Sequence, residues 1–415
     1  MKISNLTVNH MVYAIVDKNP EFSWYIESNE KNVKQTAYQI AVYSNDSEVW
    51  NSGKISSDKQ NFIKYEGVLE SKTSYKVCVS VWDNKNNTAD AETFFETAFL
   101  STAEWKGKFS KSPFERNESK LFTYGIENPA VFFEKEFDID SSVKSAKLYA
   151  TAYGLYNVWL DNKRISDSEF APEYTPYNKI LNYQCYDVTK QLALGKNTLK
   201  FLVGDGWFFC PQTEVEMNEN IENLSILYQL EITYENGKKA TVISDGTELC
   251  HKSNIVFSDL FMGEKVDMTL PDGEVKKAAA ADYSLKNLRI QPMPPIKAVE
   301  EIKAEKIYIS QNGETIVDFG QVIAGKCRIK INEKKGTVIK LEHTEITDKN
   351  GNFFSALDLV KQTDVIVGNG DSFVYEPTFT FHGFRYVRVT GITNPRKEDF
   401  TAVVLSTEKE NIGAF

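Results

Sequence analysis

Apolar and polar residues alternate with a period of two along most of this chain. Within residues 37–43 and 75–82, every second side chain is apolar, which places these side chains on one face of a strand. Aromatic residues make up 13% of the chain, and Asn, Gly and Asp separate the alternating segments. No convincing helical periodicity is present. The pattern predicts an all-β protein built from sandwiches or barrels.

The 415 residues suggest about three domains at ~150 residues each. About seven short strands in residues 1–100 are typical of a fibronectin-III or immunoglobulin-like sandwich. A weakly periodic linker precedes a second domain, 101–297, which we interpret as a jelly-roll-like sandwich of the galactose-binding type. The Pro-rich stretch 291–295 cannot continue a central strand and marks its end. A third β-sandwich, which we interpret below as concanavalin-like, follows at 298–408, before the short segment 409–415.

Charge and cysteine usage narrow the classes of partner. The net charge is −10, and the Lys and Arg residues are scattered. We therefore expect neither a nucleic-acid nor a membrane partner, since both need clustered positive charge. A neutral partner such as a sugar is compatible with this balance. The five widely spaced cysteines, and the lack of a signal peptide or an apolar run of ~20 residues, predict a reduced, cytoplasmic protein.

Candidate carbohydrate contacts lie in the second domain. Trp207 follows Gly204-Asp205-Gly206, and an exposed indole face is a platform for a pyranose ring, with Asp205 accepting hydroxyl hydrogen bonds. The favoured alternative is a core tryptophan at a strand end. Glu264 and Asp267 are oxygen donors for an acid/base pair or a calcium ion, the only cofactor considered. Here the favoured alternative is a pair of loop carboxylates that bind backbone N–H groups.

The third domain holds two of the four histidines. His343 and Glu345, two residues apart, suggest a general-base pair on one strand face. We favour a structural role for this region and predict that His382, Arg385 and Tyr386 lie at a domain interface. No second histidine stands two or four residues from His343 or His382, so no metal site is predicted.

Several short sequence motifs occur in a particular order along the second and third domains. These motifs and their order resemble those of bacterial α-L-rhamnosidases of glycoside hydrolase family 78. The resemblance covers about residues 130–415 by motif, and 1–100 by domain type only. Asp161-Asn162 replaces the usual Asn-Gly turn, and Val322 stands where Asn is usual. The motifs are Ala152–Tyr156, Leu160–Ile165, Ala171–Tyr177, Gly204–Phe208, Asp259–Asp267, Asp318–Gly325, Asp364 and His382–Tyr386.

The resemblance implies a fold and a function. Members of the family hydrolyse terminal α-L-rhamnosides with inversion, using two carboxylates on a helical α/α barrel that follows the sandwiches. Residues 409–415 resemble the lead-in to that barrel, so no catalytic residue is carried over to this sequence. We expect an accessory, non-catalytic region that supports the barrel, whether in one protein or as a separate chain, and that is inactive alone.

Two alternatives stay open. The first is a stand-alone protein that binds rhamnose-containing glycans. The second is a complete enzyme with its site on the sandwiches, which requires a pocket with two carboxylates of perturbed pKa. The favoured interpretation also predicts an exposed apolar patch on the third domain, where a barrel would dock.

Overall fold

The computed structural model describes residues 1–117, 126–210, 221–271, 273–355, 357 and 359–407. These residues form strands and two short 3₁₀ helices, η1 (Thr102–Glu104) and η3 (Lys397–Asp399), with no α-helix among them. They divide into two compact units, residues 1–106 with 288–294 and residues 107–287 with 295–407. The predicted all-β class is confirmed.

The first unit is a sandwich of two sheets. One sheet contains β1, β3 and β6, and the other has the order β2-β8-β7-β4-β5. The alternation in residues 75–82 points Tyr75, Val77, Val79 and Val81 into the core, where each is at most 2% exposed. The Tyr75 ring stacks on Phe95 at 4.8 Å. The strands of these sheets are β1 (Lys2–Val8), β2 (Tyr13–Val16), β3 (Glu21–Glu27), β4 (Gln35–Ser44), β5 (Ser47–Asn51), β6 (Ile63–Lys64), β7 (Ser74–Asp83) and β8 (Thr88–Thr97). The unit also includes β23 (Leu288–Ile290), which lies in neither of the two sheets.

The second unit begins with two facing sheets. One has the order β13-β12-β15-β10-β18-β21, and the other contains β22-β9-β16-β11-β14, with β17 paired to β16. Phe201 of the first sheet stacks on Tyr228 of the second at 5.3 Å. The strands are β9 (Phe109–Lys111), β10 (Val131–Ile139), β11 (Val143–Tyr153), β12 (Leu155–Leu160), β13 (Lys163–Arg164), β14 (Leu181–Asp187), β15 (Gly195–Gly204), β16 (Ser225–Tyr234), β17 (Lys239–Ile243), β18 (Leu249–Lys252), β21 (Lys276–Lys277) and β22 (Ala279–Ala281).

Both tight turns predicted for this part form as expected. Asp161 and Asn162 have φ values of 47° and 64°, which Asn and Asp tolerate better than other side chains. Gly237, in the predicted Asn-Gly turn, has φ 81° and joins β16 to β17.

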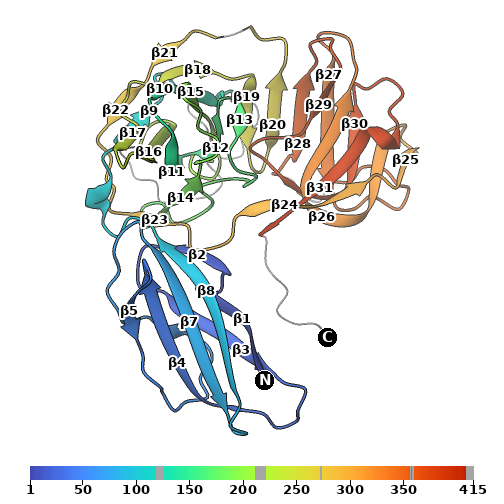
Figure 1. The fold of residues 1–415 in the computed structure, drawn as a ribbon. Helices are drawn as coiled ribbons and strands as arrows, with labels where there is room; N and C mark the ends of the chain where they lie inside the picture. The colour runs from blue at the N-terminus through green and yellow to red at the C-terminus, as the bar shows by residue number, and fades with distance from the viewer. Residues whose placement is uncertain (118–125, 211–220, 272, 356, 358, 408–415) are drawn as a thin grey trace. The chain divides into compact units, whose positions relative to one another are not determined.

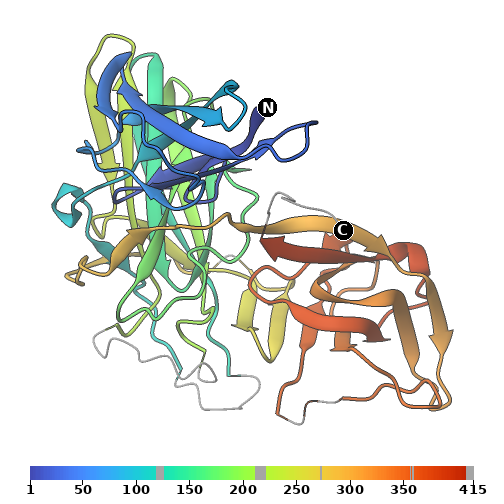
Figure 2. The ribbon, with the colours of Figure 1, turned by 90° about the horizontal axis from the view of Figure 1, so that it is seen from below.

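A ten-stranded sheet completes the second unit, with the order β19-β20-β28-β27-β30-β26-β31-β24 and with β25 and β29 paired to β26. In Figures 1 and 2 the yellow hairpin β19–β20 runs beside the orange and red strands. The strands are β19 (Ile255–Asp259), β20 (Gly263–Asp267), β24 (Ile296–Lys303), β25 (Lys306–Ile309), β26 (Thr315–Ile331), β27 (Val338–Thr344), β28 (Thr363–Val367), β29 (Phe373–Tyr375), β30 (His382–Thr390) and β31 (Phe400–Thr407).

The hairpin β19–β20 lies before the domain boundary predicted near residue 297, yet it pairs with the sheet that follows that boundary. Val266 of β20 stands opposite Ile366 of β28 in a parallel ladder. Gly263 permits the close approach, because a Cβ atom there would lie 2.0 Å from the carbonyl oxygen of Thr363. The exact domain limits stay a prediction. Among the described residues, no helix is both long and apolar enough to cross a membrane.

Candidate functional site

The glycines around Trp207 serve close packing. A Cβ atom on Gly204, the last residue of β15, would lie 2.4 Å from the Phe379 ring. Gly206 has φ +56°, and a Cβ atom there would overlap the Leu155 side chain at 2.2 Å. Both positions therefore require glycine for the turn to fit between its neighbours.

Asp205 is held by an arginine. Its two carboxylate oxygens accept hydrogen bonds from Arg116 at 2.8 and 2.7 Å, and Asp205 is 7% exposed. The Arg116 guanidinium also lies over the Phe209 ring, 4.3 Å from its centroid. A bidentate pair of this kind is among the strongest polar contacts in proteins. A sugar hydroxyl would have to compete with Arg116, and the predicted carbohydrate contact of Asp205 stays a prediction.

Trp207 is half-buried between aromatic neighbours. Its ring meets Phe170 and Tyr174 edge-on, with centroids 6.0 Å away in each case. Tyr174 is 53% exposed. Most of the aromatic surface open to a ligand here therefore belongs to Tyr174, which our sequence analysis did not single out.

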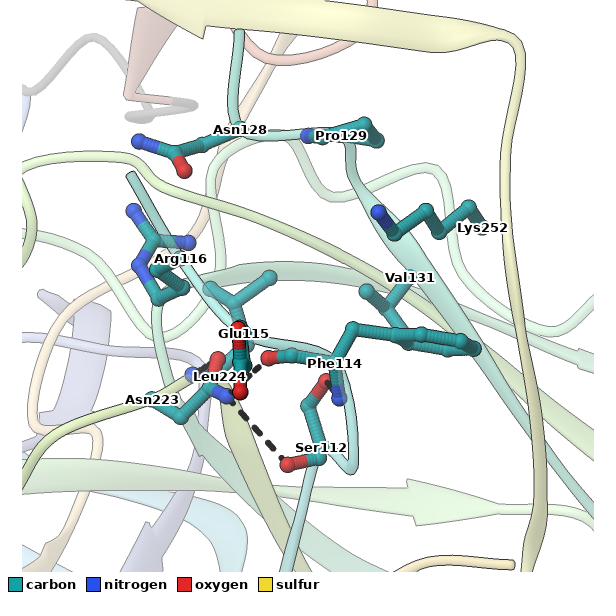
Figure 3. A pocket seen from close by; sticks show the side chains of 10 residues that line it. All are labelled: Ser112, Phe114, Glu115, Arg116, Asn128, Pro129, Val131, Asn223, Leu224 and Lys252. Carbon is teal, nitrogen blue, oxygen red and sulfur yellow. Dashed lines mark hydrogen bonds between the residues drawn. The ribbon is translucent and has the colours of Figure 1, made fainter. Parts of the chain in front are cut away.

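A small hollow lies beside Arg116 (Figure 3). Arg116, Asn128 and Lys252 point polar groups toward it, and Asn223 donates a hydrogen bond of 2.6 Å to the carbonyl of Phe114 at its base. Its cavity volume is about 10 Å³, which is room for about one water molecule. It is too small to take a pyranose ring.

The predicted pair Glu264 and Asp267 lies on β20, where side chains three residues apart leave opposite faces of the strand. Glu264 is fully buried and accepts hydrogen bonds from the N–H groups of Thr378 and Phe379, at 2.9 and 3.0 Å. Asp267 accepts the N–H and hydroxyl of Thr269. Both carboxylates thus bind groups of the fold, as in the alternative stated above; their roles in acid/base chemistry or calcium binding stay predictions.

Burial dominates the electrostatics of Glu264. Removal of its carboxyl group from water raises the pKa to about 7, and the nearby Asp364 carboxylate adds to this, whereas the two backbone N–H groups oppose it. The Tyr375 hydroxyl also donates to Glu264 at 3.2 Å. Glu264 therefore has a pKa that would suit an acid catalyst, but its side chain is fully buried and out of contact with solvent.

Three strands bring His343, Asp364 and His382 together, and all three side chains are at most 1% exposed. The Nε2 atom of His382 lies 3.1 and 3.2 Å from the two carboxylate oxygens of Asp364. The Nε2 atom of His343 lies 3.9 Å from Asp364 Oδ2, and the two imidazole centroids are 4.2 Å apart. Our search for histidines two or four residues apart missed this cluster, because its members meet through sheet pairing.

The protonation of this cluster follows from its partners. Burial, and then the proximity of His382, lower the pKa of His343 to about 3. His343 Nδ1 lies 2.9 Å from the carbonyl oxygen of Gln362 and so carries the proton of the neutral ring. Burial alone would raise the pKa of Asp364, but His382 and the N–H of Glu264 outweigh it and hold that pKa below its usual value. His343 Nε2 and His382 Nδ1 have no hydrogen-bond partner among the described residues.

The structure places the other predicted residues of the third domain as follows. Arg385 donates to Asp318 at 2.8 and 3.1 Å, and its guanidinium lies 4.9 Å from the Tyr386 ring centroid. A role for His382, Arg385 and Tyr386 at a domain interface stays a prediction. Glu345 lies beyond the end of β27 and is exposed, whereas His343 is buried, so the structure does not form the pair considered for these two residues.

Comparison with known proteins identifies the class. Residues 3–101 match the Rha78A-like N-terminal immunoglobulin domain, residues 141–311 the α-L-rhamnosidase N-terminal domain, and residues 309–406 the bacterial α-L-rhamnosidase concanavalin-like domain. The fold is thus that of the N-terminal β-sandwich domains of a glycosidase family. The chain belongs to the α-L-rhamnosidase family, as its motifs indicated.

Individual relatives agree with this assignment. An α-L-rhamnosidase of Formosa agariphila is 27% identical over 97% of this chain, which covers 47% of that protein. The structure of an α-L-rhamnosidase from Dictyoglumus thermophilum matches with a TM-score of 0.87 and 30% identity, over 98% of this chain and 49% of the other. One from Aspergillus terreus matches with a TM-score of 0.86 and 25% identity, over 98% and 49%. The chain therefore spans about half the length of these relatives.

Proposed function

We propose that this chain is a non-catalytic β-sandwich region of an α-L-rhamnosidase, which supports a catalytic barrel carried by the same protein or by a partner chain. The proposal rests on one observation: the buried carboxylates are already bound to other groups of the same fold. Glu264, Asp364 and Asp205 bind backbone N–H groups, a histidine and an arginine of the fold itself. These contacts join segments that are far apart in sequence, as expected of a scaffold.

The catalytic mechanism of the family supports a non-catalytic role for this chain. An inverting hydrolase needs two carboxylates ~6.5–9.5 Å apart, with a sugar and a water molecule between them. Glu264 and Asp364 are two carboxylates whose pKa values are shifted in opposite directions. Both side chains have 0% exposure, so neither a glycan nor its attacking water reaches them.

The test is hydrolysis of an aryl α-L-rhamnoside by the purified 415-residue chain. A full-length relative, such as the Dictyoglumus thermophilum enzyme, serves as the positive control. We expect release of the aryl alcohol by the control and none above the buffer rate by this chain. Turnover that co-purifies with the folded chain would refute the proposal.

Carbohydrate binding is the second candidate function, and one observation favours it. The exposed Tyr174 ring and the half-buried Trp207 form an aromatic surface at the end of β15, and aromatic faces bind the apolar faces of sugars. Calorimetry with L-rhamnose, with and without a chelator, tests this function. Binding should be lost in Tyr174→Ala and kept in Tyr13→Ala, a matched tyrosine that is 52% exposed. Absence of heat at millimolar sugar removes this candidate.

A further inference from the structure

The buried cluster of His343, Asp364 and His382 has the composition of a metal site. One ligand atom from each residue lies within 4.8 Å of the other two. We propose that these three side chains bind one divalent transition-metal ion, with Zn²⁺ as the best match. Two imidazoles and a carboxylate suit zinc and its neighbours in the first transition series, whereas calcium and magnesium prefer all-oxygen sites.

The distances are close to those that a zinc ion imposes. With Zn–N and Zn–O bonds of about 2.0–2.2 Å, tetrahedral ligand atoms lie about 3.4 Å apart. Asp364 Oδ2 lies 3.2 Å from His382 Nε2 and 3.9 Å from His343 Nε2. These separations lie on either side of the required value, so small side-chain movements bring both pairs to it.

The surroundings of the cluster orient two of its three residues, His343 and Asp364, as metal ligands. A metal-binding histidine usually donates its other ring N–H to a backbone carbonyl or a carboxylate. His343 does so, because Nδ1 donates to the carbonyl of Gln362 at 2.9 Å and leaves Nε2 deprotonated. The Glu264 N–H binds Asp364 Oδ1 at 2.9 Å and fixes that carboxylate in turn. Outer contacts of this kind hold ligand atoms in place.

An unpaired nitrogen points to what the cluster binds. His343 Nε2 is fully buried and has no hydrogen-bond partner among the described residues. Its lone pair and the Asp364 Oδ2 atom, 3.9 Å away, are both electron-rich. Two such atoms repel each other in a dry environment unless a cation lies between them. A metal ion bound to both, and to His382 Nε2, satisfies all three atoms at once.

Because the ligands are buried, the ion would enter while the chain folds. The experiment is therefore to unfold the full chain, remove metal with EDTA, and refold it with or without Zn²⁺. After desalting, we expect about one equivalent of zinc per folded chain and a higher Tm in the zinc-refolded sample. No zinc above background in the folded protein would overturn the proposal.

Two variants test whether the proposed zinc site is formed by the cluster of His343, Asp364 and His382. Asp364→Asn keeps the size and an acceptor oxygen of the side chain but removes its charge, so zinc should fall from about one equivalent toward background. Circular dichroism restricts this comparison to folded protein. His10→Gln/His251→Gln, which removes the two histidines outside the cluster, should keep the full zinc content. Retention of zinc by Asp364→Asn, or its loss in the double variant, would contradict the assignment.

A measurement on the unchanged chain covers the case in which Asp364→Asn does not fold. Refolding with Co²⁺ should give visible d–d bands without a thiolate-to-cobalt charge-transfer band. That charge-transfer band would mean that one of the five cysteines binds the metal, and would overturn the histidine–carboxylate site.

Discussion

The ammonium group of Lys326 lies 2.7 Å from the Glu169 carboxylate, although 157 positions separate the two residues in sequence. Lys326 is 2% exposed and Glu169 is 9% exposed, as side chains. A second cation, Arg164, approaches the same carboxylate at 3.2 Å. The pair ties β26 of the ten-stranded sheet to the segment that follows β13, within the second unit.

Removal of the Glu169 charge should destabilise the protein more than removal of the Lys326 charge. Glu169→Gln leaves the buried Lys326 ammonium without its counter-charge, and we expect the free energy of unfolding to fall by about 3–5 kcal/mol. Lys326→Met should cost less, because Glu169 keeps Arg164 as a partner. Urea denaturation of the two variants measures the difference.

An exposed pair provides the control. Lys196 and Glu136 lie 2.9 Å apart but are 64% and 63% exposed, so Lys196→Met should change stability by less than about 1 kcal/mol. Equal effects of Glu169→Gln and Lys196→Met would show that burial does not set the strength of the Lys326–Glu169 pair.

Glu264 should make stability depend on pH. Its folded pKa of about 7 lies above the ordinary value of 4.5, so between these two pH values the folded state binds more protons than the unfolded state. Stability contributed by the protonated group is therefore full below about pH 4.5 and is lost as pH rises through 7, by about 3 kcal/mol in all. The measurement is urea denaturation of the wild type and Glu264→Gln from pH 4.5 to 8.

The wild type and Glu264→Gln contain the same other titrating groups. The contribution of those groups to the pH dependence therefore cancels in the difference between the two stabilities. The stability of the wild type relative to Glu264→Gln should decrease steadily across this range. Parallel stability curves for the two proteins would mean that Glu264 ionises in the folded state as it does in water.

Gly263 and Gly237 both have positive φ values, 116° and 81°, but different surroundings. A Cβ atom on Gly237 meets nothing within 4 Å, so Gly237→Ala should cost only the backbone strain, about 1 kcal/mol. A Cβ atom on Gly263 would overlap the backbone of Thr363, and Gly263→Ala should cost about 1–3 kcal/mol more. Thermal unfolding of both variants tests whether β20 must approach β28 this closely, and equal Tm losses would exclude it.

Local sequence predicted the parts of the fold that depend on neighbouring residues. Alternation placed Tyr75, Val77 and Val79 in the core, and the Asn236-Gly237 pair specified its hairpin turn. Long-range pairing decided the rest. Asp205 meets Arg116 across 89 positions, and His382 meets Asp364 only because their strands belong to one sheet. No spacing rule along a single strand contains that information.

The most direct test of a structural role for the buried carboxylates is a paired hydrolysis assay. Wild type and Glu264→Gln, both shown to be folded, are incubated with an aryl α-L-rhamnoside under the same conditions. A structural Glu264 predicts that both release the aryl alcohol at the buffer rate. Turnover by the wild type that disappears in folded Glu264→Gln would contradict this account, because it would make Glu264 a catalytic group.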